Sequence, residues 1–144
     1  MPYKTLEISG TSVISQTPRK TSHFYKGFST VDSTSNVRLY DFDLIKQDII
    51  NHFKTKKGER VMNPTFGSVV WDLIMEPLTD QTRELLRKDI STICNSDPRV
   101  IPTQLDLTEY ENGYVLEITL VLKGTDQSSS MKLMFDQKIG LTVQ

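Results

Sequence analysis

The chain has 144 residues, of which 37% are hydrophobic, and its formal net charge is −1. This length suits one compact domain with its own core, and leaves room for an arm. The near-neutral charge excludes a general attraction to nucleic acid or to an anionic membrane. A single cysteine, Cys94, excludes an internal disulfide and indicates a reducing compartment. We find neither an apolar run of membrane-spanning length nor the layout of a signal peptide, so we expect synthesis in the cytosol.

Residues 1–38 differ from the rest of the chain in composition. They are rich in Ser and Thr, carry more Lys and Arg than Asp and Glu, and lack a sustained hydrophobic period. Such a segment buries too little apolar surface by itself to offset the entropy lost on ordering. We therefore predict an N-terminal arm over 1–38 and one domain over 39–144. The arm either stays mobile or orders on a neighbouring molecule through Phe24, Tyr25 and Phe28.

Helical periodicity starts at the beginning of the predicted domain. Apolar residues recur at helical spacing over 41–58, where Asp41 or Asp43 can cap the first turn. A short amphipathic helix is predicted over 69–74, and a second long helix over 79–97. Between the first two helices lies a dense group of turn residues, in which we expect the ring of Phe66 to turn into the core.

The last third of the chain changes to the alternating pattern of β-strands. It predicts strands at 103–110, 114–122 and 130–136, with a hairpin turn at Asn112-Gly113. Together the elements predict an α+β fold, in which two main helices plus a short helix pack on a small three-stranded, or larger mixed, antiparallel sheet.

In a three-stranded meander the first and third strands are the edges of the sheet. An open edge has unpaired backbone groups that can accept a strand from another chain. On the third strand, we expect Met131, Lys132 and Leu133 to take this role. The alternative is that the arm or the C-terminal segment 138–144 of this chain covers that edge.

The sequence contains none of the motifs that mark a nucleotide, metal or nucleophilic hydrolase site. No second His or Cys stands at ligand spacing from His52, so a surface or packing role is favoured over metal ligation. Four carboxylates could in principle supply a glycosidase pair: Glu59, Asp72, Glu76 and Glu84. Nothing distinguishes an acid with a raised pKa from a partner carboxylate among them. We therefore predict no enzyme, no cofactor and no metal site.

Four short motifs carry a resemblance to a known family. They are Lys57-Gly58-Glu59-Arg60, Pro64-Thr65-Phe66-Gly67, Pro77-Leu78-Thr79 and Asp97-Pro98-Arg99. In this order and spacing they resemble the gene-25-like (GPW/gp25) baseplate wedge family of contractile phage tails, which has a relative in the type VI secretion baseplate. The resemblance covers about residues 41–123, and Asp97 stands where the family pattern has Glu.

The resemblance implies a structural protein of the virion, located in the phage tail baseplate and assembled in the host cytoplasm. The implied partners are other baseplate wedge proteins, through a core helical bundle, and tail sheath subunits, through a sheet edge from which sheath assembly starts. The tail tube or central hub is a further candidate partner, whereas nucleic acid and membrane are not expected. The alternative function is that of a lysozyme-like peptidoglycan hydrolase.

The predicted partner-binding residues come from these motifs and from the third strand. They are Arg60, Pro64, Phe66, Gly67, Asp97, Pro98, Arg99, Met131, Lys132 and Leu133. Pro98 stiffens the exit of the long helix and fixes the direction of Arg99, whose planar guanidinium suits a bidentate contact with a partner. The alternative for Arg99 is an internal clamp that ties the helix end to the sheet.

Overall fold

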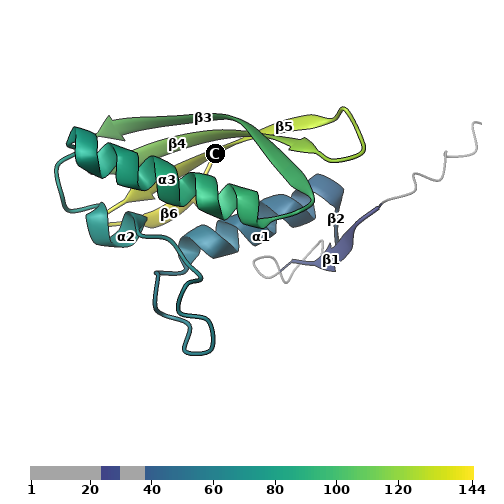
Figure 1. The fold of residues 1–144 in the computed structure, drawn as a ribbon, viewed down its shortest axis with the longest axis horizontal. Coiled ribbons are helices and arrows are strands. Elements are labelled where there is room, and N and C mark those ends of the chain that lie inside the picture. Colours follow the sequence, from purple (N-terminus) through teal and green to yellow (C-terminus); the bar gives the residue numbers. More distant parts are fainter. Residues whose placement is uncertain (1–23, 30–37) are drawn as a thin grey trace, which may run out of the picture.

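A computed structural model describes residues 24–29 and 38–144, which form six strands and three helices (Figure 1). In chain order the elements are β1 (Lys26–Phe28), β2 (Arg38–Tyr40), α1 (Asp41–Lys54), α2 (Val70–Leu73), α3 (Asp80–Ser96), β3 (Val100–Tyr110), β4 (Gly113–Leu122), β5 (Ser128–Asp136) and β6 (Gly140–Val143). All strand pairs are antiparallel, in one sheet of β1 and β2 and a second sheet with the order β3-β4-β5-β6. None of the helices in these ranges is long and apolar enough to cross a membrane.

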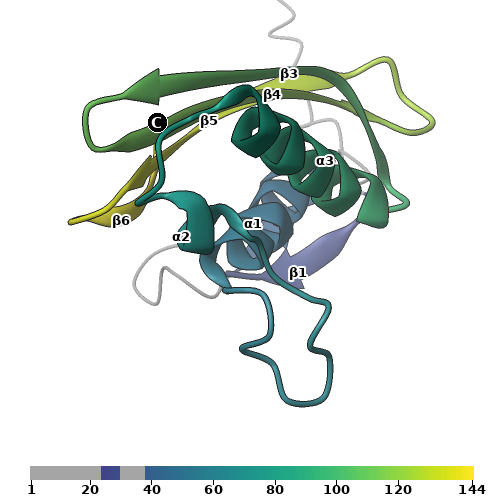
Figure 2. The same ribbon diagram turned by 60° about the vertical axis from the view of Figure 1, so that its left-hand side comes forward.

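The four-stranded sheet packs one face on the long helices α1 and α3 (Figures 1 and 2). On the central strand β4, Leu116, Ile118 and Leu120 are fully buried, whereas Glu117 between them is exposed. This alternation is the one expected of a sheet with one face on the core and one face toward solvent. The helices complete the core with an apolar stripe each: Ile45, Ile49 and Phe53 on α1, and Leu86, Ile90 and Ile93 on α3.

An aromatic cluster joins α1, α2 and β5. The rings of Phe53 and Trp71 each lie edge-on to Phe135, with ring centroids 5.7 Å apart in both pairs. The indole N–H of Trp71 also donates a hydrogen bond of 2.7 Å to the carbonyl oxygen of Phe53. Because both rings contact Phe135 in a favourable geometry and the indole also bonds to the backbone of α1, the cluster holds the short helix α2 against the core.

The expected fold class was wrong. The sheet has four strands and not three, and a separate two-stranded sheet is present, so strands contain more of the described residues than helices do. The two long helices, the short helix and the three predicted strands lie near the expected positions. The missed strands, β1, β2 and β6, have three or four residues each, which is too short for alternation to reveal them.

The prediction that the strand at 130–136 is a sheet edge was also wrong. Strand β6 pairs with Leu133–Asp136 of β5, after a turn in which Gly140 has a φ of 89°. The alternative, that the C-terminal segment covers this edge, is confirmed for that part of β5. The edge strands of the four-stranded sheet are therefore β3 and β6.

The β1–β2 hairpin lies against the start of α1. The carboxylate of Asp41 accepts hydrogen bonds of 2.9 Å from the backbone N–H groups of Phe24 and Tyr25. The expected capping of α1 by an aspartate is therefore wrong, because its N-cap is Tyr40, which makes no side-chain cap. Residues 1–23 and 30–37 of the predicted arm lie outside the described residues, so the arm boundary stays a prediction.

Candidate functional site

A long loop, residues 55–69, connects α1 to α2 and projects away from the sheet (Figure 2). Its two ends lie side by side, since the N–H of Ser68 donates to the carbonyl of Thr55 at 2.9 Å. Gly67 lies at this crossing with a φ of 114°, and a Cβ there would be 2.7 Å from the carbonyl oxygen of Lys56. Glycine is therefore required at this position of the motif, both by the positive φ and by the close approach of the backbone at Lys56.

A buried aspartate on α3 anchors the C-terminal end of this loop. Asp89 accepts hydrogen bonds of 3.0 Å from the hydroxyl of Ser68 and from the N–H of Val69, and its other oxygen is 3.4 Å from the ammonium of Lys57. These bonds compensate the cost of burying a carboxylate. This role of Asp89 was not predicted, although an aspartate next to Ile90 on the apolar stripe of a helix is a usable signal in the sequence.

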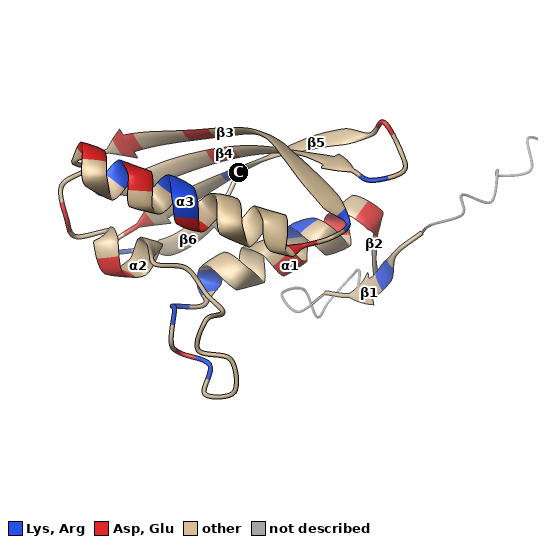
Figure 3. Ribbon diagram, in the orientation of Figure 1, with Lys and Arg blue, Asp and Glu red and all other residues tan. Residues whose placement is uncertain are grey.

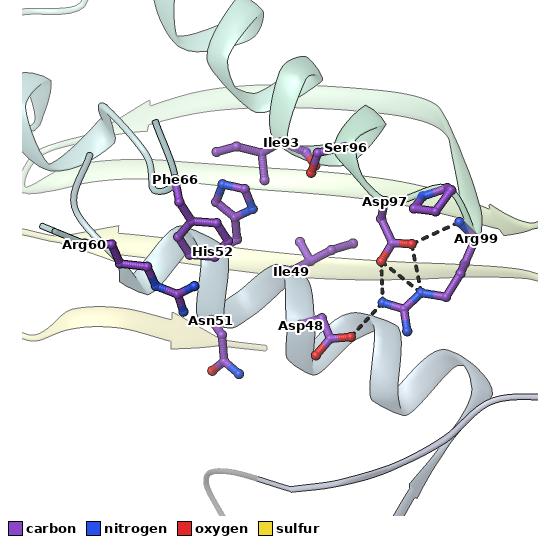
Figure 4. A pocket seen from close by; sticks show the side chains of 11 residues that line it. Asp48, Ile49, Asn51, His52, Arg60, Phe66, Ile93, Ser96, Asp97 and Arg99 are labelled. Carbon is purple, nitrogen blue, oxygen red and sulfur yellow. Dashed lines mark hydrogen bonds and ion pairs between the residues drawn. The ribbon is translucent and has the colours of Figure 1, made fainter. Parts of the chain in front are cut away.

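The ring of Phe66 packs on α1 and not in the core as expected. It stacks on the imidazole of His52, with ring centroids 3.9 Å apart, and the guanidinium of Arg60 lies 3.8 Å from its centroid (Figure 4). Burial lowers the pKa of His52; the charge of Asp89 opposes this shift, and the charges of Arg60 and Lys57 add to the lowering. The packing role predicted for His52 is confirmed.

The Asp97-Pro98-Arg99 motif forms an ion-pair cluster at the end of α3. The guanidinium of Arg99 donates to both carboxylate oxygens of Asp97, at 2.8 Å from Nε and 2.5 Å from Nη2. Nη2 also donates to Asp48 of α1 at 2.6 Å. Arg99 thus makes an internal tie from α1 to the link between α3 and β3. The alternative expected its clamp to reach the sheet, whereas these side-chain bonds reach α1 instead.

This cluster is partly shielded from water. Burial acts to raise the pKa of Asp97, but the hydrogen bonds and the charge of Arg99 outweigh it and hold that pKa below its ordinary value. The hydrogen bond with Asp97 raises the pKa of Arg99 in turn, with a further contribution from Asp48. Both groups are therefore charged across the physiological pH range.

An open groove of about 450 Å³ runs between these two clusters (Figure 4). Its lining comes from α1, the projecting loop, and the end of α3. Of the predicted partner-binding residues, it brings together Arg60, Phe66, Asp97, Pro98 and Arg99. The sequence analysis did not predict its α1 wall, which includes Asp48, Asn51 and His52.

The other predicted partner-binding residues lie elsewhere. Pro64 is exposed on the projecting loop, and Gly67 is buried at its base. On β5, the side chains of Met131 and Leu133 are buried in the core, whereas Lys132 is half-buried and pairs with Glu117 of β4 at 3.2 Å. Their role in partner binding stays a prediction.

The four carboxylates considered for a glycosidase pair are all exposed. Glu59 accepts a hydrogen bond from the N–H of Lys56 at 3.0 Å, and Asp72 pairs with the ammonium of the same lysine at 2.5 Å. The described residues also contain no cluster of three or more acidic, His or Cys side chains able to hold a metal.

Comparison with known proteins gives matches in sequence and matches in structure. The family described as baseplate wedge protein gp25 matches residues 41–127. The baseplate wedge protein gp25 of Enterobacteria phage T4 is 26% identical over 93 residues, which cover 62% of this chain and 70% of the T4 protein.

Two solved structures share the fold. One is a crystal structure of a proposed tail lysozyme from Geobacter sulfurreducens, with a TM-score of 0.53 and 20% identity, covering 64% of this chain and 90% of the other. The second is a chain of the anti-feeding prophage baseplate, determined by cryo-EM, with a TM-score of 0.53 and 21% identity, covering 72% of this chain and 84% of the other. The family match spans more than half of the sequence, from α1 through β4. The chain therefore belongs to the family of baseplate wedge proteins gp25.

Proposed function

We propose that this chain is a structural part of a contractile tail baseplate that binds other wedge proteins through the groove beside α1 and offers the edge of its sheet to a tail sheath subunit. The observation that carries the proposal is the family match over 41–127, which includes the groove and the edge strand β3. As a member of this family, the chain is a baseplate component of a contractile phage tail.

The groove is suited to a segment of a partner protein. Charged groups of both signs line it together with the apolar side chains of Ile49, Ile93 and Phe66. Partner binding at such a groove depends on shape and on paired polar groups. The tail tube or central hub stays a further candidate partner.

A matched pair of bulky substitutions tests the groove. Ser96 lines it, whereas the adjacent Asn95 does not, and both side chains are exposed. Ser96→Trp should leave the melting temperature nearly unchanged and block binding to wedge complexes that lack this chain, whereas Asn95→Trp should bind normally. Normal binding by both folded variants would rule the groove out as the docking site.

The sheet edge open to a sheath strand is β3. It is the longest strand, and no described strand pairs with its outer side. Pro102 within it lacks an N–H, as is common on edge strands. By contrast, β6 covers β5 from Leu133 to Asp136, so the C-terminal half of that strand has a partner already.

The direction of the backbone groups on β3 follows from the register of the sheet. The carbonyl of Lys132 accepts from the N–H of Gln144 at 2.9 Å, so Lys132 directs its backbone groups away from β4. Its partner on β4, Glu117, therefore turns its backbone groups toward β3, where it pairs with Asp106. Asp106 in turn directs its N–H toward β4.

Because this direction alternates along a strand, Thr108 directs its N–H toward β4 and Glu109 directs its N–H outward. Both side chains are exposed, so they form a matched pair for proline substitution. Thr108→Pro should disturb folding. Glu109→Pro should fold and join baseplates but seed sheath assembly poorly, as counted by electron microscopy of sheathed tails. A folded Glu109→Pro protein that seeds sheath at the wild-type level would exclude β3 as the docking edge.

A further inference from the structure

The tip of the projecting loop exposes two large apolar side chains that are adjacent in the sequence. Val61 is 92% exposed and Met62 is 96% exposed, the highest values among the exposed large hydrophobic residues of the described chain. Figure 2 shows that the loop reaches well beyond the helices, so its tip has no neighbour among the described elements. Adjacent apolar side chains at the end of a projection are typical of a contact with another molecule.

The loop beneath the tip is held by its own backbone. The N–H of Gly58 donates to the carbonyl of Pro64 at 3.0 Å, and the N–H of Asn63 donates to the carbonyl of Arg60 at 3.2 Å, which closes a turn around the tip. The stacking of Phe66 on His52 fixes the returning half of the loop on α1. A preformed loop loses less conformational entropy on binding than a mobile one, so it is suited to present an anchor.

The charge beside the tip is positive. Arg60 precedes Val61, is exposed, and lies over the ring of Phe66. The colours of Figure 3 show that the projecting loop carries basic and acidic positions close together. The neighbouring Glu59 turns back toward the base of the loop, where its carboxylate accepts from the N–H of Lys56. A complementary surface would therefore be apolar at its centre and acidic at its rim.

We propose that Val61 and Met62 are anchor residues that insert into an apolar pocket with a carboxylate rim on another protein of the baseplate wedge. This inference rests on the proposed function, because it requires a wedge partner. It adds a contact that is separate from the groove, since neither Val61 nor Met62 lines that groove. We assign the occupant to a different protein, because the family match makes this chain one component of a baseplate wedge; a second copy is an outcome of the test below.

The test measures binding to wedge complexes assembled from the other wedge proteins of the same phage, without this chain. The tip variant is Val61→Ser with Met62→Ser. The control variant is Met75→Ser with Ile139→Ser, two large hydrophobics outside the loop that are 73% and 74% exposed. Both variants should keep the wild-type melting temperature. The tip variant should bind about tenfold more weakly or worse, because removing a buried anchor is costly, whereas the control should bind as the wild type does.

The charge at the rim has its own measurement. Arg60→Gln keeps a planar group that can lie over Phe66 but removes the charge. Because Arg60 also lines the groove, the substitution is made in the wild type and in the tip variant. It should weaken binding of the wild type and make the affinity less sensitive to salt, but weaken binding of the tip variant much less. A photo-crosslinking residue at position 62 should label an apolar segment of a wedge protein that contains Asp or Glu.

Three results would overturn the inference. If the tip variant binds wedge complexes as tightly as the wild type, Val61 and Met62 are not anchor residues, although the proposed function stands. If the wild-type chain does not bind wedge complexes at all, the proposed function fails and this inference fails with it. If the isolated wild-type chain dimerises in sedimentation and the tip variant does not, the occupant is a second copy.

Discussion

Arg99 and Asp48 are joined by a hydrogen-bonded ion pair of 2.6 Å, although 51 positions separate them in the sequence. The same guanidinium binds Asp97, so one side chain connects the middle of α1 to the end of α3. This geometry favours a role for Arg99 in the stability of the isolated chain, beside any contact that its exposed surface makes.

Arg99→Ala should lower the free energy of unfolding by about 1–2 kcal/mol, because it leaves the half-buried Asp97 without its partner while the more exposed Asp48 loses little. Urea denaturation of the isolated chain measures this loss. Arg87→Ala, on the exposed face of α3, is the control and should change the free energy little. An unchanged free energy for Arg99→Ala, together with weak wedge binding, would favour the partner contact instead.

The acid dependence of stability should reflect Asp97. Its pKa is lower in the folded chain than its ordinary value, so its contribution is present above the unfolded pKa of about 4 and is lost as pH falls through the folded pKa. Asp97→Asn should therefore be less stable than the wild type at pH 7, and the difference should shrink as the pH falls below about 4. A difference that is the same at both pH values would show that Asp97 acts through its shape alone.

Gly67→Ala should be far more damaging than Gly58→Ala. Both glycines have a positive φ, but a Cβ at position 67 would meet the backbone of Lys56, whereas nothing lies within 4 Å of a Cβ at position 58. We expect a loss of about 2–4 kcal/mol for Gly67→Ala and about 1 kcal/mol for Gly58→Ala in the free energy of unfolding. Similar losses for the two variants would mean that the loop crossing can relax.

The purified chain should leave peptidoglycan suspensions turbid. Glu59 and Glu76, two of the four carboxylates considered for a glycosidase pair, are exposed, and Glu59 already accepts a hydrogen bond from the backbone. The measurement is the optical density of a cell-wall suspension, with lysozyme as the positive control. Clearing that disappears in Glu59→Gln or Glu76→Gln would establish the hydrolase alternative.

The sequence predicted most of the regular elements, because long periodic segments carry a clear signal. It also grouped Arg60, Phe66 and Asp97-Pro98-Arg99, which the fold brings to one groove. It could not predict the ion pair between Arg99 and Asp48, since contacts between distant segments depend on how the helices pack. The sheet order was missed because β6 is stabilised by its pairing with β5 and not by a periodic pattern of its own.

The shift in pairing between Pro102 and Gln104 limits what β3 can hold. Before the shift, the carbonyl of Arg99 accepts from the N–H of Lys123. The backbone groups of Arg99 therefore point toward β4, and the carbonyl of Pro102 points away from it. After the shift, the backbone groups of Gln104 point toward β4. The residues whose backbone groups point away from β4 therefore no longer follow at every second position from Pro102. A regular foreign strand can stay in step with Gln104–Tyr110 or with the short stretch before it, but not with both. The register shift therefore limits the length of a regular β-strand that could pair along this edge.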